Sequence, residues 1–159
     1  MTIIKKSGSR VKHLRISPLS VAKFFWEKGV EDVAINQHLT YFTYLEAIKN
    51  GYLLLEEEWQ AWPNGPAIKL VVDEMFDHRH NLKKLFKPVK VIDNELVLSW
   101  TEKIFKKYHK TEQYLIFEKA QNKPWKDARK PLKSEQQIAR IPLDSLVKFA
   151  NGKFSRTIA

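Results

Sequence analysis

The 159-residue chain contains no cysteine and only five glycines. Without cysteine it can form no disulfide, no thiolate zinc site and no cysteine nucleophile. The few glycines form neither a GxGxxG nor a GxxxxGK[ST] pattern, so the common glycine-rich loops that bind phosphates are missing. A chain of this length can still bury a core of its own, and we expect one domain that needs no cofactor.

Long apolar runs are missing as well. The longest apolar runs are about as long as the three leucines of residues 53–55. A membrane-spanning helix needs about 20 apolar residues. Residues 1–15 mix basic and polar residues without the apolar stretch of a secretory signal. We therefore expect no membrane contact and a cytoplasmic location, which the absence of cysteine also fits.

Charge is unevenly spread along the chain. The 28 basic and 18 acidic residues give a net charge of +10. Residues 27–77 hold ten acidic and three basic residues, a charge of −7, so the rest of the chain carries +17. Lysine far outnumbers arginine, the residue that binds guanine and phosphate bidentately. We interpret the positive charge mainly as solubilising, with weak non-specific nucleic-acid binding as its consequence. A Lys-rich nucleic-acid-binding regulator is the alternative interpretation.

Helical signals dominate the pattern. Residues 1–16 are predicted to be a basic, loosely ordered arm, 17–152 a single helical domain and 153–159 a tail. Ser17 and Pro18 are typical of a helix start, Asn36 is expected to cap the second helix, and Leu39, Phe42, Leu45 and Ile48 indicate its buried stripe. The pattern predicts a mainly α domain of about six helices, with helices over 17–29, 36–50, 66–78, 96–109, 111–121 and 143–150 and a short turn or helix over 124–128.

A small β-hairpin is expected between the second and third helices. Residues 52–55 and 59–62 read as two short strands around the acidic turn Glu56-Glu57-Glu58. The sequence Trp62-Pro63-Asn64-Gly65-Pro66 is typical of a turn, and Pro66 can begin the third helix. We expect the Trp62 side chain to anchor this hairpin against the core.

Residues with catalytic or metal-binding chemistry form no complete site. Glu74 and His78 lie four residues apart and share a helical face with further acids and histidines nearby, namely Asp73, Asp77 and His80. A metal-dependent hydrolase using this cluster is the less favoured alternative, because a polar helix end explains the same residues. No serine lies in a Gly-x-Ser-x-Gly elbow. We therefore expect no catalytic residue and no bound metal.

One set of segments is more specific. The helix start Gln37-His38-Leu39-Thr40-Tyr41-Phe42 is followed by Gly51, by Glu56-Glu57-Glu58-Trp59-Gln60-Ala61-Trp62-Pro63-Asn64-Gly65-Pro66 and, later, by Pro124-Trp125-Lys126-Asp127-Ala128. Over residues 20–149 this arrangement resembles the Panacea domain, the SocA-like, phage-associated antitoxin family. Lys119 departs from the pattern, since many members have His there. The positions that match the family's structural motif are Gln37, Tyr41, Phe42, Gly51, Trp62, Gly65, Pro66, Pro124 and Trp125.

This resemblance implies an antitoxin that neutralises a toxin encoded beside it by direct protein contact. It also implies a possible adaptor role that delivers the toxin to a protease complex. The motif says nothing about which toxin is bound, because one fold serves many partners. The residues expected to contact the partner are the acidic hairpin and its neighbours, Tyr52, Glu56, Glu57, Glu58 and Trp59, which suit a basic protein electrostatically.

Overall fold

The computed structural model describes residues 5–6 and 9–152, so the predicted tail over 153–159 lies outside the described residues. The described part has eight helices, which confirms a mainly α fold and adds to the expected number. They are α1 (Pro18–Glu27), α2 (Val33–Lys49), α3 (Lys69–Asp77), α4 (Leu82–Phe86), α5 (Glu95–Tyr108), α6 (Gln113–Ala120), α7 (Lys123–Arg129) and α8 (Leu143–Ala150). No helix of this part is long and apolar enough to cross a membrane.

Seven short strands accompany the helices in the described residues. Strands β1 (Lys5–Lys6) and β2 (Ser9–Arg10) pair antiparallel, and β3 (Lys12–His13) pairs parallel with β4 (Tyr52–Leu53). Strand β5 (Gln60–Trp62) lies between β6 (Gly65–Ala67) and β7 (Ala139–Arg140) in a three-stranded antiparallel sheet.

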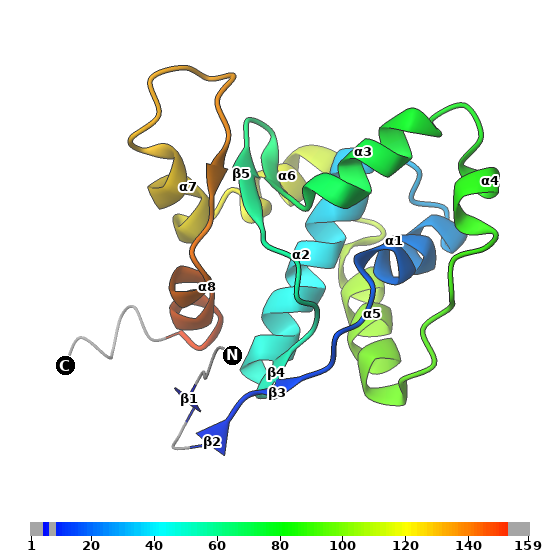
Figure 1. The fold of residues 1–159 in the computed structure, drawn as a ribbon, viewed down its shortest axis with the longest axis horizontal. Coiled ribbons are helices and arrows are strands. Elements are labelled where there is room, and N and C mark those ends of the chain that lie inside the picture. The colour runs from blue at the N-terminus through cyan, green and yellow to red at the C-terminus, as the bar shows by residue number, and fades with distance from the viewer. Residues whose placement is uncertain (1–4, 7–8, 153–159) are drawn as a thin grey trace.

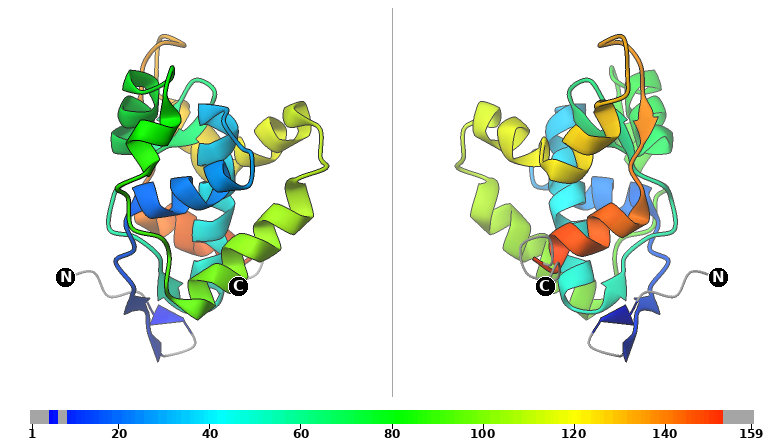
Figure 2. Two further views of the ribbon diagram at one scale, coloured as in Figure 1. Left: turned by 90° about the vertical axis from the view of Figure 1, so that its right-hand side faces the viewer. Right: turned by 90° about the vertical axis from the view of Figure 1, so that its left-hand side faces the viewer.

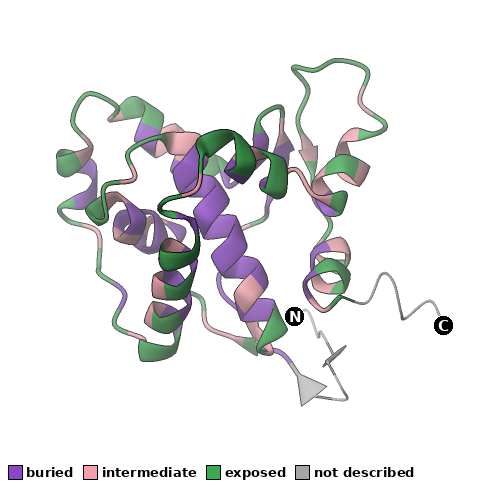
Figure 3. Cartoon of the chain, turned by 180° about the vertical axis from the view of Figure 1, so that it is seen from behind, coloured by how far each residue is buried: buried purple, intermediate pink, exposed green. Residues whose placement is uncertain are grey.

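Helix α2 is the centre of the molecule (Figure 1). It contacts α1, α3, α5, α6 and α8 as well as β4 and β6, and Figure 2 shows α5 and α6 meeting at an angle beside it. Its buried residues number 13 of 17 and include polar ones, and Figure 3 shows most of the helix in the purple of buried residues. The predicted stripe from Leu39 to Ile48 is buried as expected. A helix buried all round must be enclosed by other elements, and α2 is.

The helix starts agree with the sequence in part. Ser17 caps α1, with Pro18 in the first turn. Helix α2, however, begins before Asn36: Asp32 is its cap, with Oδ1 accepting a hydrogen bond from the Ile35 backbone N–H at 2.9 Å. The predicted cap Asn36 is therefore wrong. Its buried side chain instead donates to the carbonyl of Ala22 at 2.9 Å and ties α1 to α2.

The hairpin between α2 and α3 uses different strands from those expected. Residues 52–53 pair with residues 12–13, and Gln60–Trp62 pairs with Gly65–Ala67 around the turn at Pro63 and Asn64. The strand pairing 52–55 with 59–62 is therefore wrong. Pro66 lies in β6 and α3 begins at Lys69, because the two-residue turn leaves residues 65–67 in register with β5. The acidic triplet consequently connects two separate sheets.

The second half of the N-terminal arm is ordered on the domain. The backbone N–H groups of Lys12, Leu14 and Ile16 donate to the carbonyls of Gly51, Leu53 and Leu54 at 2.9–3.0 Å. Val11 is buried. Residues 11–16 thus differ from the loosely ordered arm expected, since they satisfy backbone acceptors that would otherwise lie open beside β4.

The stretch 81–94, which lies outside all the expected helices, contains α4 and is fixed to α1. Ser20 Oγ donates to the carbonyl of Lys90 at 2.7 Å, and the buried Lys23 ammonium donates to that of Val89 at 2.6 Å. Trp26 stacks on Phe86, with ring centroids 5.2 Å apart. Two polar side chains of α1 therefore fix the loop after α4 through hydrogen bonds to its backbone carbonyls.

Candidate functional site

Trp59, expected at the contact surface, is a core residue. Its side chain is 1% exposed and packs edge-to-face against Tyr41 and Tyr44, at centroid distances of 5.0 and 5.7 Å. Its ring is therefore not the exposed surface residue that the sequence suggested, although its side chain lines the cavity described below. Trp62, expected to be the buried anchor, is only partly buried, and its indole N–H donates to Gln60 Oε1 at 2.9 Å. Trp59 is therefore the buried tryptophan and Trp62 the more exposed one, the reverse of what the sequence suggested.

Glu56 holds the N-terminal segment in place. Its Oε2 lies 3.1 Å from His13 Nδ1, and its Oε1 accepts a hydrogen bond from Arg15 Nε at 3.3 Å. The hydrogen bond with His13, helped by the charge of Arg15, lowers the pKa of the Glu56 carboxyl below its usual value. Arg15 has a left-handed φ of 51°, a conformation that costs a non-glycine residue about 1–2 kcal/mol. Glu56 is thus engaged in an internal contact.

The other predicted contact residues have separate surroundings. Glu58 pairs with Arg140 of β7, with 3.8 Å between Oε2 and the guanidinium. Glu57 forms no ion pair within the described residues. The half-buried Tyr52 ring packs on Trp100, with ring centroids 5.5 Å apart. Tyr52 does not line the cavity that the three glutamates share. Of the five residues, the structure therefore gathers the three glutamates and Trp59 at one place.

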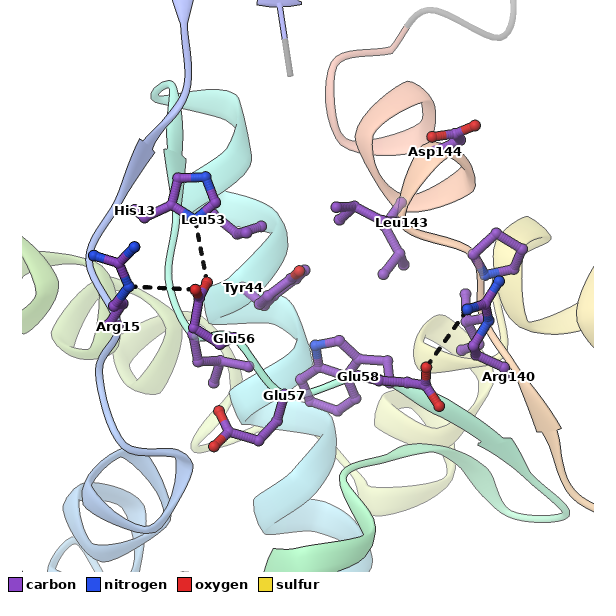
Figure 4. Close-up of a pocket in the computed structure, with 15 residues that line it drawn as sticks. His13, Arg15, Tyr44, Leu53, Glu56, Glu57, Glu58, Arg140, Leu143 and Asp144 are labelled. Atoms are coloured by element: carbon purple, nitrogen blue, oxygen red, sulfur yellow. Dashed lines mark hydrogen bonds and ion pairs between the residues drawn. The ribbon is translucent and has the colours of Figure 1, made fainter. Parts of the chain in front are cut away.

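These four residues line a cavity of about 630 Å³, which we call the acidic cavity. Figure 4 shows its walls: His13, Arg15 and Glu56 on one side, Arg140, Leu143 and Asp144 on the other, and Tyr44 of α2 between them. Its lining carries four carboxylates and two arginines, a charge of −2 with His13 neutral, in a chain of charge +10. Burial, with a further contribution from Glu56, raises the pKa of the Tyr44 hydroxyl. It therefore stays protonated.

Sequence signals for the far wall of this cavity were weak. Arg140, Asp144 and Leu143 come from β7 and α8, more than 80 positions after the acidic triplet. Only the proline at position 142, which precedes α8, marked the region as a helix start. Asp144 lies in the first turn of α8, where a carboxylate is favoured by the helix dipole.

Several residues singled out in the sequence lie close together in the fold and form hydrogen bonds with neighbouring elements, although they are far apart in sequence. Gln37 Oε1 accepts a hydrogen bond from the Ile68 N–H at 2.8 Å. The Tyr41 hydroxyl donates to Asn122 Oδ1 at 2.9 Å, and Asn122 caps α7, the helix that begins with Lys123-Pro124-Trp125. The Trp125 indole N–H in turn donates to the carbonyl of Trp62 at 2.8 Å. Helix α2, the β5–β6 hairpin and α7 are thereby joined.

His38, which the sequence pattern did not single out, lies directly against Gly65 of the β5–β6 hairpin. A Cβ on Gly65 would lie 2.4 Å from His38 Nε2, so only glycine fits there, and its φ of +141° also favours glycine. The His38 ring packs edge-to-face on Phe117 at 4.8 Å. Burial lowers the pKa of His38 to about 4, so the ring is neutral at pH 7.

A second cavity, of about 550 Å³, lies beside His38 and has no charged residue in its lining. Gln37 and His38 line it, and both keep a buried nitrogen without a hydrogen-bond partner. Phe76, 57% exposed, and Ile138, 44% exposed, stand at its wall. The two cavities therefore differ in chemistry: one is charged and the other neutral.

The structure does not assemble the candidate metal cluster of α3. Asp73 pairs with Lys69, and His78 Nδ1 lies 2.9 Å from the backbone carbonyl of Glu74, while Asp77 and His80 are exposed. Across residues 5–6 and 9–152, no three His, Asp or Glu side chains are placed to share a metal ion.

No protein-family model, curated protein or solved structure matches this chain.

Proposed function

We propose that this chain is an antitoxin-like binding protein, not an enzyme, and that it neutralises a toxin encoded beside it by direct protein–protein contact. The resemblance to the Panacea domain motivates the proposal. The observation that carries it is a set of hydrogen bonds: Tyr41 of α2 reaches the cap of α7, Trp125 of α7 reaches the hairpin at Trp62, and Gln37 of α2 accepts from the Ile68 N–H just after the hairpin. Because these residues meet in space, they support the interpretation of the motif as a structural signature.

The acidic cavity is the contact surface that we assign to this function. Its lining is negative on a basic chain, and a local charge of opposite sign steers a basic partner and fixes its orientation. Basic toxins that act on RNA have the complementary charge. Delivery of the bound toxin to a protease is compatible with the same surface.

Co-expression tests the function directly. The gene beside this one is induced in a host, with and without the present chain, and growth is followed. We expect growth arrest from the neighbour alone, rescue by the chain, and co-purification of the two proteins. The proposal fails if the chain neither binds the neighbouring product nor relieves its toxicity.

A control variant separates loss of contact from loss of fold. Reversing all three glutamates to Lys would break the Glu56 contacts with His13 and Arg15 as well as the Glu58–Arg140 pair. Glu57→Lys leaves these contacts intact and is the cleaner change. We expect it to weaken rescue, whereas Glu118→Lys on the exposed face of α6, away from the cavity, leaves rescue unchanged.

A further inference from the structure

We infer that the acidic cavity receives a lysine or arginine side chain from an exposed segment of the partner, together with the backbone carbonyl beside that side chain. This inference rests on the proposed function and names the chemistry that its contact surface recognises. Three properties of the lining carry it: unpaired carboxylates, apolar walls and a buried hydrogen-bond donor.

The carboxylates supply the charge. The two arginines of the lining are taken up by Glu56 and Glu58, whereas Glu57 and Asp144 form no ion pair in the described part of the chain. Figure 4 shows these two carboxylates on opposite sides of the cavity. A cation that enters between the two walls therefore meets negative charge from both, and an anion is repelled.

Apolar groups supply the room for a side-chain stem. Leu53, Leu55, Leu143 and Leu146 line the cavity together with the Tyr44 ring. Lysine and arginine bury their methylene groups against such surfaces while the charged end stays near water and carboxylates. A hydrated metal ion would gain nothing from these walls, so the lining favours a long organic cation.

Trp59 supplies the third requirement. Its side chain lines the cavity and is 1% exposed, and its indole Nε1 has no hydrogen-bond partner. An indole N–H can only donate, and a buried donor without an acceptor costs about 1–3 kcal/mol. A backbone carbonyl next to the basic side chain provides that acceptor, which a simple polyamine does not have.

The test uses a short peptide as the probe. Acetyl-Gly-Arg-Gly-amide is titrated into the full chain, and the ¹⁵N–¹H signal of the Trp59 indole, assigned with Trp59→Phe, is followed. The control probe replaces arginine with citrulline, which has nearly the same shape and no charge. We expect a saturable shift with the arginine peptide and binding of the citrulline peptide that is weaker by roughly fivefold or more.

Two conservative variants locate the charge. Glu57→Gln and Asp144→Asn are each expected to weaken the arginine peptide by roughly two- to fivefold, while Glu118→Gln on α6 leaves its affinity unchanged. Spermidine should compete poorly, because it brings no carbonyl to Trp59. Equal binding of the two peptides, or no saturable shift with either, overturns the inference. In that event, rescue of growth by the wild-type chain would still support the proposed function, so the two failures are distinguishable.

Discussion

At the scale of single residues, Trp59 joins the core to the floor of the acidic cavity. Its ring fills the space between Tyr41 and Tyr44. Removing a fully buried tryptophan loses its apolar contacts and leaves a void. Trp62, by contrast, keeps part of its ring in solvent. The two residues therefore make a matched pair for measuring how much the burial of a tryptophan contributes to the free energy of unfolding.

We predict that Trp59→Ala lowers the free energy of unfolding by about 3–5 kcal/mol, as for other buried aromatics cut to alanine. Trp62→Ala should lower it by clearly less, because less of the Trp62 ring is buried. Urea unfolding followed by circular dichroism measures both. A larger loss for Trp62→Ala than for Trp59→Ala would contradict the assignment of Trp59 as the anchor.

His38 should make stability depend on pH. Its pKa in the folded chain is about 4, compared with 6.5 for an unperturbed histidine, because burial disfavours the charged ring. As the pH falls below 6.5 the unfolded chain takes up this proton first, so stability is lost between pH 6.5 and 4 and is fully present above that range. The linkage amounts to a loss on the order of 3 kcal/mol.

The measurement for His38 is the free energy of unfolding at pH 7 and at pH 5 for the wild type and for His38→Asn. We predict that the wild type loses more stability over this interval than the variant, which has no group titrating at position 38. Identical losses in the two proteins would show that His38 does not contribute.

At the scale of elements, residues 11–16 behave as part of the domain. The amide protons of Lys12, Leu14 and Ile16 are bonded to carbonyls of residues 51–54. We predict that the amides of Leu14 and Ile16 exchange with solvent more than about a hundredfold more slowly than in an unstructured peptide, since exchange requires a local opening. Hydrogen exchange followed by NMR tests this. Exchange at the rate of a free peptide would instead support a loose arm.

Local signals explain which elements could be predicted. Helix α1 begins at a proline, α8 directly follows one, and α5 follows a clear apolar period, so each was found within one or two residues. Strand β4 pairs with residues 40 positions earlier, and nothing in either segment encodes that partner. Helix α2 was expected to begin at Asn36, whereas Asp32 is its cap, and only the packing of α1 against α2 decides that Asn36 is interior.

The candidate site was predictable on one side only. The three glutamates are conspicuous in sequence, and they do line the acidic cavity. Asp144 and Arg140 reach it because α8 packs on α2 and β7 pairs with β5, contacts that depend on the whole fold. The burial of Trp59 was missed because a tryptophan beside an acidic turn can be exposed or buried, and only its neighbours in the fold decide which.

At the scale of the whole molecule, folding brings the acidic block of residues 27–77 against bases from outside it. Glu46 pairs with Lys103 at 2.8 Å, Glu56 with Arg15 at 3.3 Å and Glu58 with Arg140 at 3.8 Å. These pairs are partly exposed, so each adds little stability. Their effect on charge is larger, because they offset three of the ten acidic residues of the block and leave Glu57 and Asp144 as the acids of the cavity that form no ion pair in the described residues.

The remaining positive charge sets what the chain does with nucleic acids. Much of it is lysine on exposed positions of α5–α7 and the turns between them, including Lys106, Lys110, Lys119 and Lys126. Lysines of this kind attract phosphate as point charges and read no base sequence.

We predict dissociation constants of ~10⁻⁴–10⁻⁶ M at physiological salt for two DNA duplexes of unrelated sequence, with the same steep loss of affinity as salt rises. Fluorescence anisotropy over a salt series measures this. A nanomolar constant for one duplex and a micromolar one for the other would favour a nucleic-acid-binding regulator, whereas equal, salt-sensitive values leave the negatively charged cavity as the surface that distinguishes one partner from another.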